Sequence, residues 1–319
     1  MHSAFKNIRY KGSICFSVAI FIYKAYLLVR YQLVPDEYSI VKKYKSTFNR
    51  KLDTQNPSSL NEKIQWYKTK GKNPLMVKCS DKYAVREYVG KTIGEEYLVP
   101  LIFHTQEPAE ITKDKFPDHP FIIKANHTAG TNHIVRNKSK VNWHKIRVDC
   151  RWWLSLNYAL FEKEWQYAQI EPRIVVEQLL LDKEGKIPFD YKLHFFNGEF
   201  GFTQVDIDRF GDRRRNLYDE NWNLLPFNWS KLDKEGCVLW PNGKEVSRPR
   251  NLKQLIQLGK KLAAPFPYVR VDFYLLEDRI YFGELTFHHG GGFEHFMPNS
   301  WDEYYGKLVP LVKMSRNDI

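Results

Sequence analysis

The fold is decided by two neighbouring stretches, YVRVDFYLL at residues 268–276 and IYFGELTF at residues 280–287, joined by Glu277-Asp278-Arg279. Both stretches alternate apolar and polar residues, the pattern of strands with one buried face, and the short connector predicts an antiparallel hairpin. A turn centred on Asp278 would place three pairs on one face: Leu276 with Ile280, Asp272 with Glu284, and Arg270 with Thr286.

Two carboxylates, Asp272 and Glu284, would then oppose each other. Like charges at a Cβ separation of roughly 4.5 to 5.5 Å repel unless a cation lies between them. Oxygen ligands favour Mg²⁺ over Zn²⁺, with Mn²⁺ as an alternative. Arg270, on the same face, suits contact with a transferring phosphoryl group. A merely solvated face is the alternative, but the apolar residues between these positions favour a hairpin anchored in a core.

Two earlier strand-like stretches each place a charged residue near the end of an apolar run. The run PFIIKAN at 120–126 carries Lys124 into a small polar loop with Gly130, whose backbone N–H groups suit phosphates. The run RIVVEQLL at 173–180 is apolar between Arg173 and Glu177, and the Glu177 carboxylate, near its end, can accept from an adenine amino group. A surface hairpin and an ordinary strand-end residue are the respective alternatives.

Residues 190–205 form the clearest hairpin, because Asn197-Gly198 is the preferred pair of a type I′ turn. Asp190, Lys192 and His194 share one face of it, and Lys192 is a second candidate phosphate contact or a salt-bridge partner. Asp206-Ile207-Asp208 follows and matches the D-x-D pattern of metal-dependent glycosyltransferases.

A glycine-rich segment, His288-His289-Gly290-Gly291-Gly292, follows the second hairpin strand. Glycines let the backbone approach a ligand closely, so an anion-binding nest is expected, with a flexible turn as the alternative. Adjacent histidines point to opposite sides of an extended chain, which argues against a two-histidine metal site.

The net charge of +12 favours anionic partners. No nucleic-acid-binding signature accompanies it, so nucleic acid is not an expected partner. Hydrophobic residues make up 43% of the 319, enough for a substantial core. Four cysteines, at positions 15, 79, 150 and 237, form no C-x-x-C pair and suit free thiols in a reducing compartment.

The first forty residues are basic, then apolar, then basic again. Lys6, Arg9 and Lys11 precede the apolar run Ile14–Tyr23, which is about half the roughly 20 residues needed to span a bilayer. We therefore expect an interfacial helix that contacts a membrane surface. An uncleaved anchor and a core helix of the domain are the alternatives.

The remaining helices are predicted from caps and periodicity. One is expected to begin at Ser58-Ser59 and run to Trp66, and a second to be capped by Ser80, cover Asp81–Val89 and stop at Gly90. Two more are expected over Trp143–Trp165 and Asn251–Ala264. Helices mixed with short strands predict an α+β fold.

In their order along the chain these pieces resemble the ATP-grasp superfamily, and more closely its teichuronopeptide-biosynthesis-like (TupA-like) branch of bacterial surface-polysaccharide pathways. The resemblance covers about residues 45–310 and rests on Asn56–Lys63, Asp81–Arg86, Asp190–Lys192, Arg270–Asp272 and Gly283–Phe287. It implies a nucleotide held between two α+β subdomains and a small N-terminal helical region. The implied segments are 1–40 with membrane association, 41–115 as a helical and substrate region, 116–180 as the lid, and 181–319 with the metal site.

The resemblance also implies a role for each candidate residue. Lys124 would contact the α- and β-phosphates, with Gly130 in the loop over them and Lys192 as a second contact. Glu177 would bind the adenine amino group, and Leu179 the adenine edge through its backbone. Asp272 and Glu284 would hold Mg²⁺, Arg270 would contact the transferred phosphoryl group, and Gly291 and Gly292 would line the acyl-phosphate site. Thr286, the third candidate metal residue, stands where D-alanine–D-alanine ligases have asparagine. Its hydroxyl is a poorer Mg²⁺ ligand than an amide carbonyl, which leaves a second metal ion open.

The implied activity is an ATP- and Mg²⁺-dependent carboxylate–amine ligase that acts through an acyl phosphate. It would amidate a uronic acid or amino acid in capsule or other cell-envelope polysaccharide biosynthesis, in the cytoplasm, at or anchored to the inner membrane. An acidic glycan or amino acid is the expected substrate, drawn by Arg209, Arg213 and Arg215 unless these belong to a solvated loop. A sugar-nucleotide-dependent glycosyltransferase and a non-catalytic glycan-binding protein are the alternatives.

Overall fold

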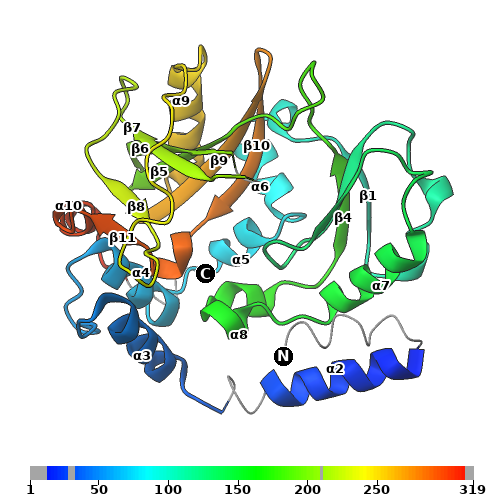
Figure 1. The fold of residues 1–319 in the computed structure, drawn as a ribbon, viewed down its shortest axis with the longest axis horizontal. Helices are drawn as coiled ribbons and strands as arrows, with labels where there is room; N and C mark the ends of the chain where they lie inside the picture. The colour runs from blue at the N-terminus through cyan, green and yellow to red at the C-terminus, as the bar shows by residue number, and fades with distance from the viewer. Residues whose placement is uncertain (1–12, 28–32, 209–210, 313–319) are drawn as a thin grey trace. The chain divides into compact units, whose positions relative to one another are not determined.

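The computed structural model describes residues 13–27, 33–208 and 211–312, and the chain divides into two compact units (Figure 1). Unit 1 takes its described residues from 1–39, 81–84 and 99–180. Unit 2 takes its described residues from 40–80, 85–98 and 181–319. Both units combine helices with antiparallel sheet, so the α+β prediction is confirmed.

Unit 1 is built on a four-stranded antiparallel sheet of order β1-β4-β2-β3. The strands are β1 (Leu101–Thr105), β2 (Phe121–Ala125), β3 (Asn132–Val135) and β4 (Ile174–Gln178). Its helices are α2 (Ser13–Leu27), η3 (Pro108–Glu110), η4 (Lys113–Lys115), α7 (Trp143–Leu154), α8 (Ala159–Glu162) and η5 (Trp165–Gln169).

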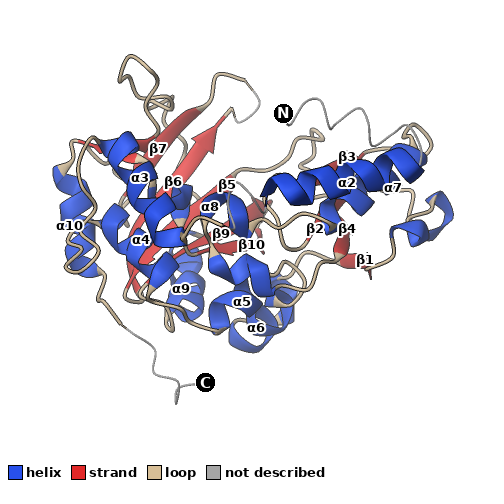
Figure 2. Ribbon diagram, turned by 90° about the horizontal axis from the view of Figure 1, so that it is seen from below, coloured by secondary structure: helices blue, strands red, loops and turns tan. Residues whose placement is uncertain are grey.

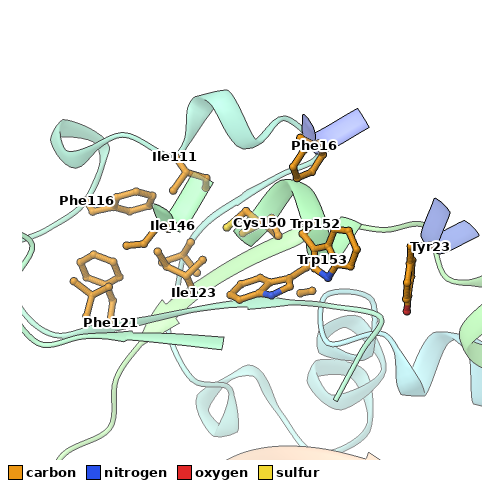
Figure 3. Close-up of a cluster of buried hydrophobic side chains, with 14 of the residues drawn as sticks. Phe16, Tyr23, Ile111, Phe116, Phe121, Ile123, Ile146, Cys150, Trp152 and Trp153 are labelled. Carbon is orange, nitrogen blue, oxygen red and sulfur yellow. The ribbon is translucent and has the colours of Figure 1, made fainter. Parts of the chain in front are cut away.

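The core of unit 1 joins this sheet to α7 and α2 (Figure 3). Ile123 of β2 and Ile146 and Trp153 of α7 are buried in one apolar cluster. Phe16 and Tyr23 of α2 complete it from the N-terminal side of the chain. One face of the N-terminal apolar helix therefore belongs to a core, which agrees with the alternative prediction of a core helix.

Unit 2 is built on a five-stranded antiparallel sheet of order β10-β9-β5-β6-β7 and a small β11-β8 pair. The strands are β5 (Asp190–Phe196), β6 (Glu199–Ile207), β7 (Arg214–Tyr218), β8 (Asn228–Ser230), β9 (Tyr268–Leu276), β10 (Arg279–Thr286) and β11 (His295–Met297). Its helices are α4 (Leu60–Thr69), α5 (Leu75–Ser80), α6 (Val85–Thr92), η2 (Glu95–Tyr97), α9 (Leu252–Ala263), η6 (His289–Gly292) and α10 (Ser300–Leu308). Helix α3 (Asp36–Phe48) begins at the boundary between the units.

Helix α9 covers one face of the larger sheet, where it contacts β9, β5 and β6 (Figure 2). Period-two alternation sends Val269, Val271 and Phe273 of β9 to that apolar face. The other face carries Tyr268, Arg270 and Asp272. An aromatic cluster that includes Phe202, Trp229 and Tyr305 fixes α10 and the β8 segment beside Tyr268. Polar side chains are thus held on a rigid sheet.

Several local predictions are confirmed. Ser59 caps α4 in a capping box with Glu62. Asn197 and Gly198 have φ values of 53° and 78°, as a type I′ turn requires. Helix α9 starts directly after Asn251.

The helix predicted from Ser80 to Gly90 is wrong at both ends. Ser80 is the last residue of α5, and the Asp81 carboxylate accepts from the Tyr83 N–H, which turns the chain before α6 begins at Val85. Gly90 lies inside α6, and it is Gly94, with a φ of 120°, that follows the helix. The helix predicted over Trp143–Trp165 is interrupted after Leu154.

Within the described residues, no helix combines the length and apolarity needed to cross a membrane.

We expect Gly306→Ala to destabilise the protein. A Cβ at this position of α10 would lie 2.2 Å from the Ser58 carbonyl oxygen and 2.7 Å from the Ser59 Cα. Both are backbone atoms, which cannot move aside as the end of a flexible side chain can. Overpacking of this kind typically costs about 1–3 kcal/mol. The measurement is the free energy of unfolding in urea.

Gly90→Ala is the matched control. Its Cβ would meet only the flexible Glu95 Cγ at 3.1 Å, and alanine favours a helix interior by roughly 0.5–1 kcal/mol. Equal stability of Gly306→Ala and the parent would show that α10 does not rest on the start of α4.

Candidate active site

The β9–β10 hairpin brings the predicted acidic pair together. Asp272 is the direct cross-strand partner of Glu284, and Arg270 is the partner of Thr286. The third predicted pair is wrong, since Leu276 pairs with Arg279 and Ile280 pairs with Leu275. The turn has two residues rather than three, and its first residue, Glu277, has a φ of 57°.

A β-bulge at Gly283 restores the register for the functional end of the hairpin. The two-residue turn pairs Ile280 with Leu275, on the apolar face, and the one-residue shift between Phe282 and Glu284 returns Glu284 to its place opposite Asp272. A Cβ at Gly283 would lie 3.0 Å from the Asp272 carbonyl oxygen. Glycine is therefore suited to the bulge that sets the acidic pair.

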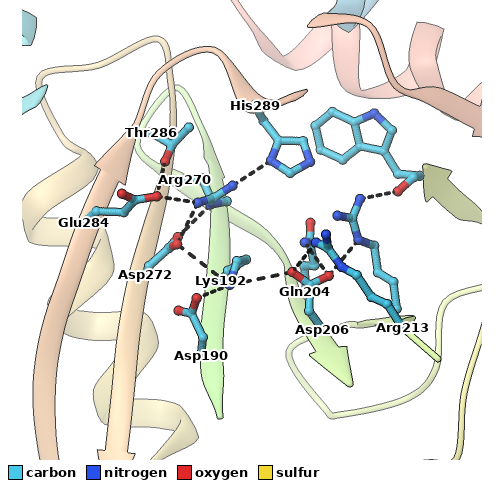
Figure 4. Close-up of polar contacts among 12 residues, drawn as sticks. Asp190, Lys192, Gln204, Asp206, Arg213, Arg270, Asp272, Glu284, Thr286 and His289 are labelled. Carbon is cyan, nitrogen blue, oxygen red and sulfur yellow. Dashed lines mark hydrogen bonds and ion pairs between the residues drawn. The ribbon is translucent and has the colours of Figure 1, made fainter. Parts of the chain in front are cut away.

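Arg270 lies between the two carboxylates (Figure 4). Its Nε and Nη2 donate to the two oxygens of Asp272 at 2.6 and 2.7 Å, and Nη2 also donates to Glu284 Oε1 at 2.9 Å. Asp272 is 2% exposed, whereas the Glu284 side chain is 46% exposed. Burial raises the pKa of Asp272, and the charge of Arg270 acts against that rise.

Lys192 joins this group from the adjacent strand β5. It lies directly opposite Asp272 in the sheet register and forms a buried ion pair with Asp190. Its Nζ is also 3.8 Å from Asp206 Oδ2 and 3.9 Å from Asp272 Oδ2. The predicted residues Lys192, Arg270, Asp272 and Glu284 thus form one cluster. Thr286 extends it by donating to Glu284 Oε1 at 3.1 Å.

His289 is a member of the cluster that sequence reasoning missed. Arg270 Nη1 and His289 Nδ1 are 2.9 Å apart, and His289 Nε2 and Glu294 Oε2 are 3.1 Å apart. A guanidinium only donates, so Nδ1 accepts and the ring proton lies on Nε2, which donates to Glu294. Burial lowers the pKa of His289 to about 4, which keeps the ring neutral at pH 7.

The chain of buried charges continues from Glu294 to Arg215 and Asp206. Arg215 Nη1 donates to Glu294 Oε2 at 2.7 Å, and its Nε donates to Asp206 Oδ1 at 2.9 Å. Arg213 donates to Asp206 Oδ2 at 2.9 Å and stacks 4.1 Å from the centre of the Trp240 ring. Arg215 is 3% exposed, so the solvated-loop interpretation is wrong for this residue, and Arg209 lies outside the described residues.

The two acids of the D-x-D pattern at residues 206–208 have different surroundings. Burial would raise the pKa of Asp206, but Arg215, Lys192 and Arg213 lower it below its ordinary range. Its Oδ1 accepts from Arg215 and its Oδ2 from Arg213. Asp208 has a φ of 48° just beyond β6 and accepts from the Asp212 N–H at 3.1 Å. Asp206 therefore belongs to the buried charge cluster, whereas Asp208 belongs to a local turn.

The donor set of this cluster fits a divalent cation of the Mg²⁺ type. No group of three or more histidine, cysteine or acidic side chains placed to hold a metal occurs among the described residues. Mg²⁺ is usually bound through one or two carboxylates together with substrate phosphates, which Asp272 and Glu284 can supply. The cluster also has more carboxylates than cations: Asp190, Asp206, Asp272, Glu284 and Glu294 against Lys192, Arg213, Arg215 and Arg270.

The backbone of the glycine-rich segment is fixed by hydrogen bonds from helix α4, which differs from the flexible turn considered as an alternative. Gly290, Gly291 and Gly292 have φ values of 56°, 66° and 71°, and the last two are buried. Gln65 Nε2 donates to the carbonyls of Gly291 and Gly292 at 2.9 and 2.8 Å. Lys68 Nζ donates to the Gly291 carbonyl at 2.5 Å. Helix α4 therefore fixes the backbone of this segment.

In unit 1, two of the residues expected to contact a nucleotide contact each other. Lys124 Nζ lies 2.5 Å from Glu177 Oε2, across neighbouring strands β2 and β4. The Leu179 N–H donates to the Pro120 carbonyl. While this bond is present, the backbone group of Leu179 that remains for an adenine edge is its carbonyl. Gly130 has a φ of 72° in an exposed loop, with open space around the position of a Cβ.

A family model for TupA-like ATP-grasp proteins matches residues 62–310. The chain belongs to this TupA-like ATP-grasp family. Membership places it among ATP-dependent ligases of the ATP-grasp superfamily and confirms the ATP-grasp fold. The match covers all of the unit 2 cluster and the strands β1 to β4 of unit 1.

Several solved structures are similar to this chain at low sequence identity. The D-alanine–D-alanine ligase of Bacillus anthracis is 13% identical, with 79% of this chain and 68% of that chain covered and a TM-score of 0.39. The Helicobacter pylori enzyme is also 13% identical, with 81% and 68% covered and a TM-score of 0.39. PsnB, an ATP-grasp ligase complexed with a phosphomimetic variant of its minimal precursor, Mg and ADP, is 10% identical, with 67% and 52% covered and a TM-score of 0.37. This TupA-like chain thus spans between about half and two thirds of these proteins. No curated protein matches it significantly.

The hydrogen bonds of His289 predict its protonation state. In ¹⁵N NMR spectra of histidine-labelled protein at pH 7, we expect His289 to be neutral with its proton on Nε2, because Arg270 occupies Nδ1 as a donor. The signals of the His289 ring nitrogens are assigned as those that are missing from the spectrum of the His289→Asn variant. His295, which lies in β11 and is partly exposed, is the internal control. A proton on Nδ1, or a charged ring, would contradict the contact with Arg270.

Proposed function

We propose that this TupA-like ATP-grasp protein is an ATP- and Mg²⁺-dependent carboxylate–amine ligase that acts through an acyl phosphate. The observation that carries the proposal is the placement of Arg270 between Asp272 and Glu284 on one hairpin. Family membership supports the coarser part, an ATP-dependent ligase.

Asp272 and Glu284 would hold the metal ion, with Mg²⁺ as the expected metal and Mn²⁺ as an alternative. When bound, Mg²⁺ supplies positive charge that offsets charge on the phosphates during transfer. Arg270 would contact the transferred phosphoryl group, and Lys192 is a second cation on the same face. Thr286, bonded to Glu284, would orient that carboxylate, and a second metal ion stays an open part of this proposal.

Nucleotide binding would use the residues of unit 1. Lys124 would contact the α- and β-phosphates and Glu177 the adenine amino group, with Leu179 at the adenine edge and Gly130 in the loop over the phosphates. Lys124 and Glu177 now neutralise each other at 2.5 Å. Binding would therefore exchange this ion pair for one contact from each residue to the nucleotide.

The reaction has two steps. A substrate carboxylate oxygen attacks the γ-phosphorus of ATP, the bond to ADP breaks, and an acyl phosphate forms. An amine then attacks the acyl carbon, loses a proton, and phosphate leaves as the amide forms. Gly291 and Gly292, whose backbone is fixed by Gln65, would line the site of this acyl phosphate.

For the substrates we propose a uronic acid or amino acid of a capsule or other cell-envelope polysaccharide. The net charge of +12 supports an acidic acceptor, and Arg213, whose side chain is 30% exposed, is a candidate contact. We place the reaction in the cytoplasm, where ATP is available. Free Cys15, Cys79, Cys150 and Cys237 suit that reducing compartment.

We expect Asp272→Asn and Glu284→Gln each to lower ADP release roughly 100-fold or more, the scale of preorganised charge stabilisation. The measurement is ADP release with Mg²⁺ against paired uronic acids and amino acids, with hydroxylamine added to trap the acyl phosphate. Circular dichroism verifies that the variants fold.

Asp208→Asn is the matched control and should retain most activity, because its carboxylate serves a local turn. If Asp208→Asn were inactive, Asp272→Asn active, and UDP rather than ADP the product, the enzyme would be a glycosyltransferase and the ligase proposal wrong.

Arg270→Lys should also lose roughly 100-fold, although it keeps the charge. A lysine cannot make the planar paired contacts that Arg270 makes to Asp272, nor present a fork to a phosphoryl group. The measurement is kcat for ADP release at saturating ATP. Parent-like kcat in Arg270→Lys would show that only a point charge is needed.

A further inference from the structure

Helix α2 presents an apolar stripe to solvent. Val18 is 50% exposed, Phe21 is 74% exposed and Ile22 is 47% exposed. These positions are separated by three and four residues, so they lie on one face of the helix. Grouped exposure of this kind marks an interaction surface, whereas scattered apolar residues on a surface are ordinary.

The opposite face of α2 is anchored in unit 1. Phe16, Ala19, Tyr23 and Leu27 are all less than 5% exposed. Phe16 meets the Trp152 ring edge-on at 6.4 Å between centroids, and Tyr23 lies 5.0 Å from the same ring. Arg151 stacks 4.6 Å from the Phe16 ring. The helix is thus fixed in orientation, and its apolar stripe stays outward while the core face is occupied.

We propose that the α2 stripe docks on an anionic membrane surface. Helix α2 contains 15 residues and no acidic side chain, and its Lys24 is exposed. In the sequence, Lys6, Arg9 and Lys11 precede the helix and Arg30 follows it. Apolar side chains that enter the boundary between headgroups and acyl chains, with lysines and arginines that meet anionic headgroups, are the two requirements of interfacial binding.

The length of α2 favours lying on the membrane over crossing it. At 1.5 Å per residue, the helix falls well short of the roughly 20 residues that a bilayer requires. A second copy of this chain is a poorer occupant, because a symmetric contact would bring together two copies of a helix that carries Lys24 and no acidic side chain. The surface is independent of the proposed ligase reaction, and it would bring the enzyme to acceptors held at the membrane.

The test uses the full-length chain and the triple variant Val18→Ser, Phe21→Ser, Ile22→Ser. Because these side chains are exposed, the variant should unfold at the parent temperature. Co-sedimentation is measured with phosphatidylcholine vesicles that contain about 30% phosphatidylglycerol, an anionic lipid, and with pure phosphatidylcholine vesicles. We expect the parent to bind the anionic vesicles, and the triple variant to bind at least roughly tenfold more weakly.

Phe189→Ser is the matched control, since Phe189 is also exposed, at 46%, but lies in unit 2. It should bind vesicles as the parent does. Removing residues 1–30 is not an equivalent test, because it would also strip Phe16 and Tyr23 from the core of unit 1.

Phe21→Trp supplies a second readout that keeps the core untouched. Its fluorescence should shift to the blue with anionic vesicles and not with neutral ones. The proposal is overturned if the parent does not bind anionic vesicles, if the triple variant binds them as tightly as the parent, or if the emission of the Phe21→Trp variant does not change on binding. A parent dimer that the triple variant converts to a monomer would assign the stripe to a second copy instead.

Discussion

Asp272 and Glu284 can face each other across one hairpin because the guanidinium of Arg270 lies between them. Its Nη2 donates to both carboxylates, at 2.7 and 2.9 Å. Removing an arginine and a carboxylate from water is unfavourable unless every polar atom finds a partner. The remaining Nη1 meets His289, so the geometry of the hairpin and that of the glycine-rich segment depend on the same side chain.

The same requirement extends through unit 2. His289 donates to Glu294, Glu294 accepts from Arg215, and Arg215 donates to Asp206. Each buried charge is satisfied by the next, across strands and loops far apart in sequence. A network of this kind contributes little net stability compared with apolar packing, and clusters of buried ionisable groups with shifted pKa values are typical of functional sites.

The sequence predicted the acidic pair correctly through two errors that cancelled. It assigned three residues to the turn, where the hairpin has two, and it omitted the extra residue that Gly283 inserts into β10. Each difference shifts the register by one. A lone glycine in a strand pattern does signal a bulge, so the correct register was accessible from local rules.

The His289–Glu294–Arg215 contacts were not accessible in the same way, because periodicity places residues on faces but does not bring separate segments together. Glu294 lies beyond the glycine-rich turn, and Arg215 comes from β7. The predicted start of a helix at Ser80 was wrong for a related reason. Asp81 binds both the Tyr83 N–H and the Asn126 side chain, and the second contact is long-range. Local patterns therefore predicted the hairpins, and tertiary contacts determined the remainder of the site.

The candidate ligand contacts share one electrostatic property in both units. Every cation expected to meet phosphate is already paired with a carboxylate: Arg270 with Asp272 and Glu284, Lys192 with Asp190, and Lys124 with Glu177. Under the proposed function, a metal ion would take up Asp272 and Glu284 while phosphates met Arg270 and Lys124. At the hairpin this exchange is balanced in charge, because the metal ion would face both carboxylates while the phosphates faced Arg270. At Lys124 it is not, because Glu177 would exchange a cation for the neutral amino group of adenine. Preorganised electrostatic stabilisation, which needs every buried charge paired, would therefore be concentrated at the hairpin.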